Sequence, residues 1–400
     1  MYNKIFNRTG KVLVIILILA ITAYAIIKLN KNKLDYIPIQ PIAVNSLGEK
    51  YVGHDTCIEC HLDIVKTHLE TAHFKSSSIS SKNNILGSFL EGANTFKLND
   101  AVFYKMVLNK NEAFQEAYHS KDNKKISSSK FDITIGSGTK GQTYLTWDKN
   151  RLYQQQISYY TPTDSWVNSP QYPLYKIKPR PVIPKCLGCH TTYVEPLGNY
   201  LIDKTNNRYK KKNIVFGIDC EKCHGPAGNH VALARQDRLK SEGNAIIGFK
   251  NLTRQQRLDA CALCHSGLSE KTKRGILNFK AGDTLFHKSD HTTNNQNLDV
   301  HGNQYGLLIQ SQCFVKSDQM DCTTCHNAHK NERGAVSTFN QKCIGCHDLE
   351  TLTHRETLQD LDCIKCHMPV QASSKLLING QERDSIMALK VRTHLIKVYE

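Results

Sequence analysis

The stretch GIDCEKCHGPAGNH, residues 217–230, contains a Cys-x-x-Cys-His motif, and this motif governs how the chain folds. The chain repeats it seven times, and the repeats use 14 of its 15 cysteines. Cys-x-x-Cys-His is the attachment signal for covalently bound c-type haem. The motif cysteines are Cys57, Cys60, Cys186, Cys189, Cys220, Cys223, Cys261, Cys264, Cys322, Cys325, Cys343, Cys346, Cys363 and Cys366. The histidines that end the motifs are His61, His190, His224, His265, His326, His347 and His367.

The spacing of the motif suits haem attachment. Thiols at positions i and i+3 lie on one side of a helical turn, where both can reach the two vinyl groups of one porphyrin. The histidine at i+4 lies on the same face and can be an axial ligand of the iron. Zinc ribbons and redox dithiols also use paired cysteines, but neither explains a histidine after every pair. The sequence therefore predicts seven covalent haem c groups, with the motif histidines as iron ligands.

Residues 12–27, VLVIILILAITAYAII, form an apolar run with basic residues on both flanks. As a helix this run is about 24 Å long, slightly short of a ~30 Å hydrocarbon core. It is either an uncleaved anchor or a signal peptide cut near Ala25, and we favour the anchor because the apolar run continues beyond that point. Haem c is attached outside the cytoplasm, so we expect a single-pass inner-membrane protein. Its globular part would lie in the periplasm or outside the cell.

The spacing of the motifs divides the chain into four segments. These are a membrane anchor or signal peptide (residues 1–33), a linker with the first haem segment (34–80), a β-rich insertion with a Pro-rich link (81–184), and a six-haem core (185–400). Strand-forming residues and turn signals alternate between residues 96 and 168, which predicts a small antiparallel sheet of three to five strands. The haem-dense part has too few residues per cofactor for an ordinary core. We therefore expect a mainly α and irregular multihaem cytochrome c fold around stacked haems, with this inserted sheet and an N-terminal transmembrane helix.

The formal net charge of +16 does not indicate nucleic-acid binding. Two propionates on each of seven haems would offset most of it, and no nucleic-acid-binding module is visible. The lysine-rich runs at residues 121–125 and 210–212 are expected to be exposed loops.

Several elements resemble those of the multihaem cytochromes related to cytochrome c-554 and hydroxylamine oxidoreductase. Residues 217–230 are similar to the C-E-x-C-H-G-P-x-x-x-H element, in which the last histidine ligates a neighbouring haem. Residues 51–53 and 71–73 resemble the first haem element, 322–329 the C-x-x-C-H-x-x-H element, and 363–369 the late C-x-x-C-H-M-P element. The resemblance implies distal iron ligands at His73, His230, His329, His354 and His394.

His301 is a further candidate ligand, because it lies in a polar, glycine-containing loop ahead of the fifth motif. Cys313, the cysteine outside the motifs, is either a soft axial ligand or an inert packed thiol, and the packed thiol is favoured.

The function expected is electron transfer between redox partner proteins, such as a quinol-oxidising complex or other cytochromes. Related ammonia-forming nitrite reductases usually replace one motif histidine by lysine, whereas all seven motifs here end in histidine. The chain is thus expected to be an electron-transfer protein rather than an enzyme. The alternative is a terminal reductase that acts on a nitrogen or sulfur oxyanion at one five-coordinate haem. A scaffold without redox function, with the strand insertion as a docking module, is the third possibility.

Overall fold

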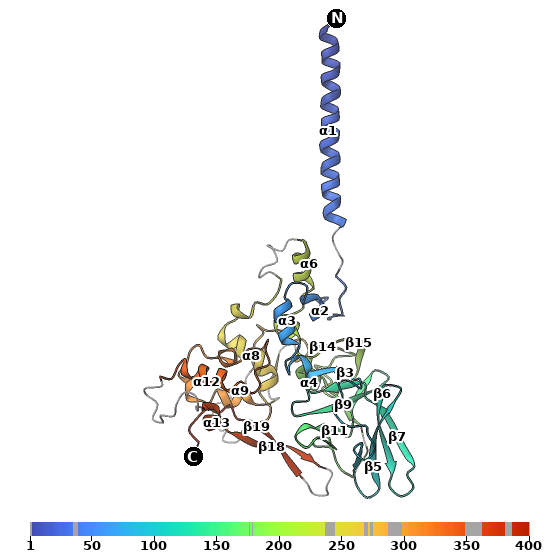
Figure 1. Cartoon of the computed structure of the whole chain (residues 1–400), viewed down its shortest axis with the longest axis vertical. Helices are drawn as coiled ribbons and strands as arrows, with labels where there is room; N and C mark the ends of the chain where they lie inside the picture. The colour runs from blue at the N-terminus through green and yellow to red at the C-terminus, as the bar shows by residue number, and fades with distance from the viewer. Residues whose placement is uncertain are drawn as a thin grey trace.

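The computed structural model describes residues 2–34, 39–175, 177, 179–236, 245–267, 271–272, 275–286, 298–348, 362–380 and 386–399. Within them, the short helices that carry the fourth to seventh Cys-x-x-Cys-His motifs lie at one end of the body. The strands that follow the first motif lie at the other end (Figure 1).

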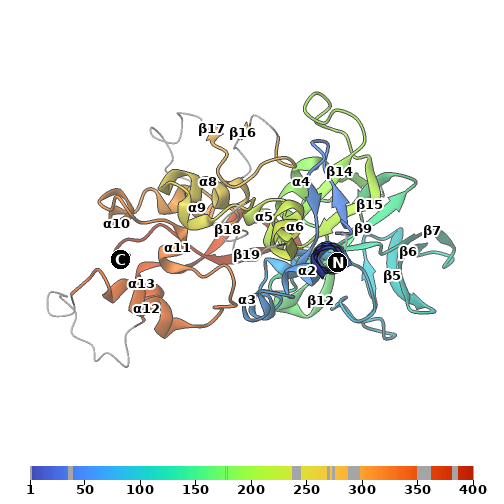
Figure 2. The same ribbon diagram turned by 90° about the horizontal axis from the view of Figure 1, so that it is seen from above.

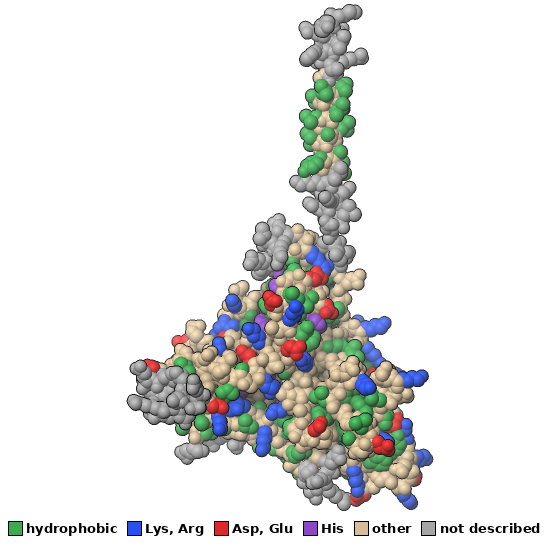
Figure 3. All heavy atoms as spheres, viewed as in Figure 1, with side chains coloured by type: hydrophobic (Ala, Val, Ile, Leu, Met, Phe, Trp, Pro, Cys, Tyr) green, Lys and Arg blue, Asp and Glu red, His purple; other side chains and the backbone are tan. Residues whose placement is uncertain are grey.

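Helix α1 (Tyr2–Leu34) projects away from this body (Figure 1). Its described apolar side chains are exposed along the helix (Figure 3), Leu13 and Tyr24 to 67% each. Among the described residues, no helix has the length and apolar content that crossing a membrane requires. The prediction of an N-terminal transmembrane helix is therefore wrong, since the apolar run of residues 12–27 falls short of the roughly 20 residues that a bilayer needs.

The haem motifs lie in short helices or at their ends. The helices that carry them are α2 (His54–Cys57), α4 (Pro184–His190), α5 (Cys220–His224), α8 (Arg254–His265), α11 (Cys322–Cys325), α12 (Val336–Ile344) and α13 (Cys363–His367). The amides of His61, His326 and His347 each donate to the carbonyl of the first cysteine in their own motif, at 2.9 Å. This is the i to i−4 bond of a helical turn, so both thiols and the histidine share one side.

The other helices are short as well. They are α3 (Leu62–His68), α6 (Gly228–Gln236), α9 (Gln304–Leu308) and α10 (Gln312–Val315), with 3-10 turns at Phe74–Ser76, Thr161–Thr163 and Phe249–Asn251.

A four-stranded antiparallel sheet forms the outer part of the insertion. Its strands, in spatial order, are β4 (Thr95–Lys97), β5 (Val102–Asn109), β6 (Glu112–His119) and β7 (Lys125–Lys130). Alternate side chains of β5 are buried, which is the pattern of a strand with one face on a core. Lys110 and Asn111 join β5 to β6 with positive φ angles of 51° and 80°, as a two-residue hairpin turn requires.

A second, nine-stranded sheet connects the insertion with the C-terminal part of the chain. Its path is β13-β10-β9-β11-β12-β18-β19, and β3 and β8 pair beside β9. The strands are β3 (Ser77–Ile79), β8 (Ile133–Ile135), β9 (Gly141–Asp148), β10 (Arg151–Gln154), β11 (Ile157–Tyr160), β12 (Ser165–Asn168), β13 (Arg180–Pro181), β18 (Val370–Asn379) and β19 (Ile386–Arg392). Viewed from above, β18 and β19 lie between the insertion and the last motif helices (Figure 2).

Three two-stranded antiparallel sheets lie within the haem-bearing segments. They pair β1 (Ala43–Val44) with β2 (Lys50–Tyr51), β14 (Thr191–Pro196) with β15 (Tyr209–Phe216), and β16 (Lys271–Thr272) with β17 (Leu285–Phe286). The fold is therefore mixed α/β with several antiparallel sheets, which corrects the prediction of a mainly α and irregular fold with one small sheet. Residues 210–212 also belong to β15 rather than to a loop, although their side chains are exposed.

The two largest apolar cores lie against the strands of the insertion. The first lies inside the insertion, where the rings of Phe131 and Tyr144 stack at 4.3 Å beside the buried Trp166. The second joins the insertion to the second motif, because Leu152 of β10 packs with Leu187 of α4. The insertion and the second haem motif are therefore parts of one packed unit.

Candidate haem sites

Cysteines of different motifs lie against one another. The thiols of Cys57 and Cys220, from the first and third motifs, lie close enough to interact electrostatically. Three other pairs of thiols from different motifs lie equally close. They are Cys189 of the second motif with Cys264 of the fourth, Cys261 of the fourth with Cys322 of the fifth, and Cys343 of the sixth with Cys363 of the seventh.

Two weaker contacts connect these pairs. Cys223 of the third motif lies within electrostatic reach of Cys264 of the fourth, and Cys325 of the fifth within reach of Cys346 of the sixth. The motifs thus follow one another in the order first, third, fourth, fifth, sixth and seventh, with the second beside the fourth.

Three histidine pairs bring the ring of a motif histidine close to that of a predicted distal ligand. The ring centres of His73 and His265 are 6.2 Å apart, those of His224 and His329 are 6.1 Å apart, and those of His326 and His394 are 6.1 Å apart. Two imidazoles on opposite sides of one metal ion, each bonded at about 2 Å, have ring centres about 6 Å apart. The three separations therefore fit an iron between each pair.

Ring nitrogens of the motif histidines are also fixed as metal ligands require. Nδ1 of His224 bonds to the Ile247 carbonyl at 2.8 Å, and Nδ1 of His367 to the Lys397 carbonyl at 3.0 Å. Nδ1 of His265 lies 3.2 Å from the Gln304 amide oxygen. A bond of this kind selects the tautomer that leaves Nε2 for the metal.

Two of the distal candidates in these pairs, His73 and His394, have pKa values far below that of a free imidazole. Burial lowers the pKa of His73 and that of His394 to about 4 in each case. In addition, Nδ1 of His394 is buried and forms no hydrogen bond with any described residue. A neutral imidazole is the form that binds a metal, so these residues fit haem iron.

The other three distal candidates are placed less directly. His301 lies within electrostatic reach of His190, whose pKa is lowered by burial and then by His301. His230 is on α6, and Arg235 of the same helix donates to Glu59 inside the first motif at 3.1 and 3.2 Å. This contact brings α6 beside the haem segment of His61. His354 lies outside the described residues.

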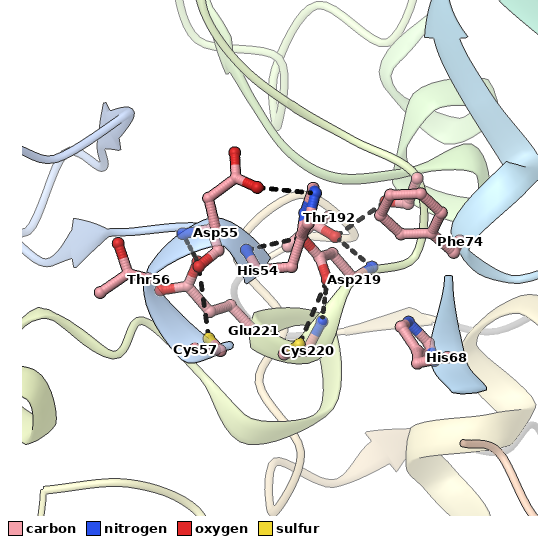
Figure 4. A network of polar contacts seen from close by, with 12 residues as sticks. His54, Asp55, Thr56, Cys57, His68, Phe74, Thr192, Asp219, Cys220 and Glu221 are labelled. Atoms are coloured by element: carbon pink, nitrogen blue, oxygen red, sulfur yellow. Dashed lines mark hydrogen bonds and ion pairs between the residues drawn. The ribbon is translucent and has the colours of Figure 1, made fainter. Parts of the chain in front are cut away.

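Glu221, inside the third motif, fastens the first motif to the third (Figure 4). Its carboxylate accepts hydrogen bonds from the amides of Val52 at 3.0 Å, Gly53 at 2.9 Å and Ala227 at 2.7 Å, and its side chain is buried. Burial raises the pKa of Glu221, although the three amide donors oppose the rise. The carboxylate thus holds the strand that enters the first motif at a set position.

Asp219 makes a second link between the same two motifs (Figure 4). One of its oxygens lies 2.8 Å from Nδ1 of His54, and the other accepts from the Cys220 amide at 2.8 Å. The hydrogen bond to Asp219 raises the pKa of His54 against the effect of burial. Burial alone raises the pKa of Asp219, but the hydrogen bonds from His54 and Cys220 outweigh it, and the net shift is downward.

The pair of His54 and Asp219 should make stability depend on pH. The contribution of His54 is fully present below its unfolded pKa of 6.5 and is lost as the pH rises through the raised folded pKa. The contribution of Asp219 is present above its unfolded pKa of 3.8 and is lost as the pH falls through the lowered folded pKa. We expect His54→Gln to lower the denaturation midpoint more at about pH 5.5 than at about pH 8.5. Denaturant titrations of both proteins at the two pH values test this, and a larger effect at the higher pH would contradict it.

Two residues that the motif pattern leaves unassigned, His68 and Cys313, also lie close to haem segments. The ring nitrogens of His68 lie 3.0 Å from the Ile218 carbonyl and 3.3 Å from the Ala328 carbonyl, so His68 ties the first haem segment to the third and fifth. Cys313 lies within electrostatic reach of Cys325 and Cys343.

Asp219 and Glu221 were missed by sequence reasoning. Of these, Glu221 could have been recognised from the sequence, because it lies inside the C-E-x-C-H element and charged groups are seldom buried without partners.

Comparison with known proteins identifies related chains. Residues 141–225 match the family described as cytochrome c554 and c-prime. The multiheme cytochrome MtrA of Shewanella baltica (strain OS185) is 25% identical over 158 residues, which cover 34% of this chain and 44% of that relative. The chain therefore matches less than half the length of this curated relative. The family match confirms the resemblance drawn from the motifs and, with it, covalent c-type haem as the cofactor.

A solved structure shares the fold. The crystal structure of the outer cell wall cytochrome OcwA matches with a TM-score of 0.52 and 15% sequence identity, and the match covers 87% of this chain and 79% of that chain. The match extends well beyond residues 141–225, so the haem-bearing parts and the insertion together follow a known arrangement.

Proposed function

We propose that this chain, a multihaem c-type cytochrome that resembles the cytochrome c554 and c-prime family, carries electrons between redox partner proteins through seven haems. The succession of contacts between the seven motifs is the observation that carries the proposal. Electron transfer over a long path needs cofactors that follow one another closely. Among the described residues, each motif lies close to another, so haems bound at the motifs would meet that need.

The residues of each site suit a carrier. A bound haem supplies reversible exchange of one electron at its iron. The 14 motif cysteines would attach the haems, and the seven motif histidines would be proximal ligands. His73, His329 and His394 stand opposite three of these histidines at a spacing that supports two-histidine ligation. Ligation on both sides leaves an iron without an open position for a substrate, which favours transfer over catalysis.

The partners we propose are a quinol-oxidising complex or other cytochromes, and the location is outside the cytoplasm. The support for this location is the attachment of haem c outside the cytoplasm together with the structural match to a cytochrome of the outer cell wall. Lys and Arg side chains are distributed among Asp and Glu over the visible face (Figure 3).

The haem content and spin state of the matured protein test the proposal. We expect pyridine haemochrome analysis and intact mass to give seven covalent haems per chain, because all seven motifs are complete. Low-temperature EPR of the oxidised protein should show low-spin ferric iron and no high-spin signal. Four or fewer haems would contradict the cofactor count. A high-spin signal that responds to cyanide or nitrite would instead support the reductase alternative.

A further inference from the structure

We propose that Asp299 positions His301 as the distal ligand of a haem by fastening the loop that carries His301 to strand β18. This inference rests on the proposed function, because it takes the seven motifs to hold haems. Asp299 belongs to no haem motif and is two residues from the histidine that it would position.

The Asp299 carboxylate is fully occupied by donors from two segments. One oxygen accepts from the His301 amide at 2.8 Å and from the Ser373 hydroxyl at 2.8 Å. The other accepts from the amide and hydroxyl of Ser374, at 2.6 and 2.9 Å, and from the Lys375 amide at 3.1 Å. Burial raises the pKa of Asp299, but these donors outweigh it and lower the pKa to about 2.

The segment of β18 that contacts Asp299 has a backbone shape that fits this carboxylate. The pairing of β18 with β19 shifts register between Ala372 and Leu377, so residues 373–376 bulge out of the ladder. Ser373 is buried, and its hydroxyl oxygen accepts from the Leu376 amide at 2.8 Å, which closes the bulge. The amides of Ser374 and Lys375 then point to Asp299 instead of to a neighbouring strand.

The loop is held on the other side of His301 as well. The carbonyl of Gly302 accepts from the Gly267 amide at 2.8 Å, just after the fourth motif. Gln304 lies against Nδ1 of His265, the motif histidine itself. His301 thus stands between an anchor on β18 and two anchors on the fourth haem segment. Holding the backbone on both sides removes most of the conformational freedom that ligand binding would otherwise have to restrict.

Loss of Asp299 should affect the bond between His301 and the iron as well as the stability of the fold. With Asp299 in place, the backbone of His301 is held between β18 and the fourth haem segment. Without it, residues 298–301 lose five hydrogen bonds to β18 and to their own turn, whereas Gly302 and Gln304 keep theirs. The ring would then sample positions away from the iron.

Replacing Asp299 by alanine in the full haem-loaded chain tests the inference. We expect a high-spin ferric signal from one of the seven irons and a shifted reduction potential for one haem. His301→Ala should give the same signal, and the double variant should match His301→Ala alone, because both substitutions act on one bond. Asp100→Ala is the matched control, since Asp100 is an exposed carboxylate that pairs with Lys97 on the insertion.

Other outcomes would overturn the inference. If Asp299→Ala lowers only the denaturation midpoint and leaves the EPR spectrum and all potentials unchanged, Asp299 has a purely structural role. If His301→Ala leaves every iron low-spin in a seven-haem protein, His301 is no ligand, while the electron-carrier proposal stands. Should Asp299→Ala fail to fold, Ser374→Ala removes a single contact, and a smaller change in the same signal is expected.

Discussion

Glu221→Ala is expected to lower the free energy of unfolding by about 3–5 kcal/mol, because three buried amide donors would lose their acceptor. Each unsatisfied buried donor costs about 1–3 kcal/mol, and water can satisfy part of that demand once the side chain is gone. The loss would fall on the junction between the first and third motifs. Chemical denaturation of the haem-loaded protein, followed by far-ultraviolet circular dichroism, measures it.

Two further variants make this measurement specific. Glu221→Gln keeps one oxygen acceptor and should lose an intermediate amount of stability. Glu112→Ala removes an exposed carboxylate that pairs with Lys130, and its effect should stay within about 0.5 kcal/mol. Equal effects of Glu221→Ala and Glu112→Ala would show that the Glu221 contacts do not hold the two motifs together.

His394→Ala is expected to convert one of seven ferric irons from low spin to high spin and to shift the potential of that haem. The physical reason is that His394 faces His326 at 6.1 Å and has a buried ring nitrogen without a hydrogen bond to any described residue. Covalent attachment keeps the haem in place, so the haem count should not change. EPR combined with a spectroelectrochemical titration measures both effects.

Free imidazole provides the control for His394→Ala. Removal of the side chain leaves a space beside the iron, and imidazole added at millimolar concentration should enter it and restore the low-spin signal. His119→Ala, at the exposed end of β6, should leave the spectrum of the parent protein unchanged. An unchanged spectrum in His394→Ala would remove His394 from the set of ligands.

The strands outside the insertion explain why the fold class was mispredicted. Strand β18 has the sequence VQASSKLLIN, and its bulge places polar residues where apolar alternation would otherwise appear. Strand β15 begins with three exposed lysines after Tyr209, so it resembles a charged loop. Both strands form because the neighbouring strand in the chain, β19 for β18 and β14 for β15, completes their hydrogen bonds. Alternation within one segment does not reveal such a partner.

The sequence by itself determined the cofactor class. The attachment chemistry is local, since two thiols and a histidine at positions i, i+3 and i+4 meet within one helical turn, whatever the rest of the chain does. It also indicated the residues of the insertion that form strands, such as 102–108 within β5, because turn signals bound them on both sides.

Tertiary structure alone decided which histidines face one another. His73 and His265 belong to segments far apart in the chain, and so do His224 and His329, so no spacing rule relates them. The same is true of the contacts that set the order of the motifs, such as Cys57 with Cys220, and of the Asp299 contact with β18. These arrangements depend on how distant segments pack, and packing is a property of the whole chain rather than of any one motif.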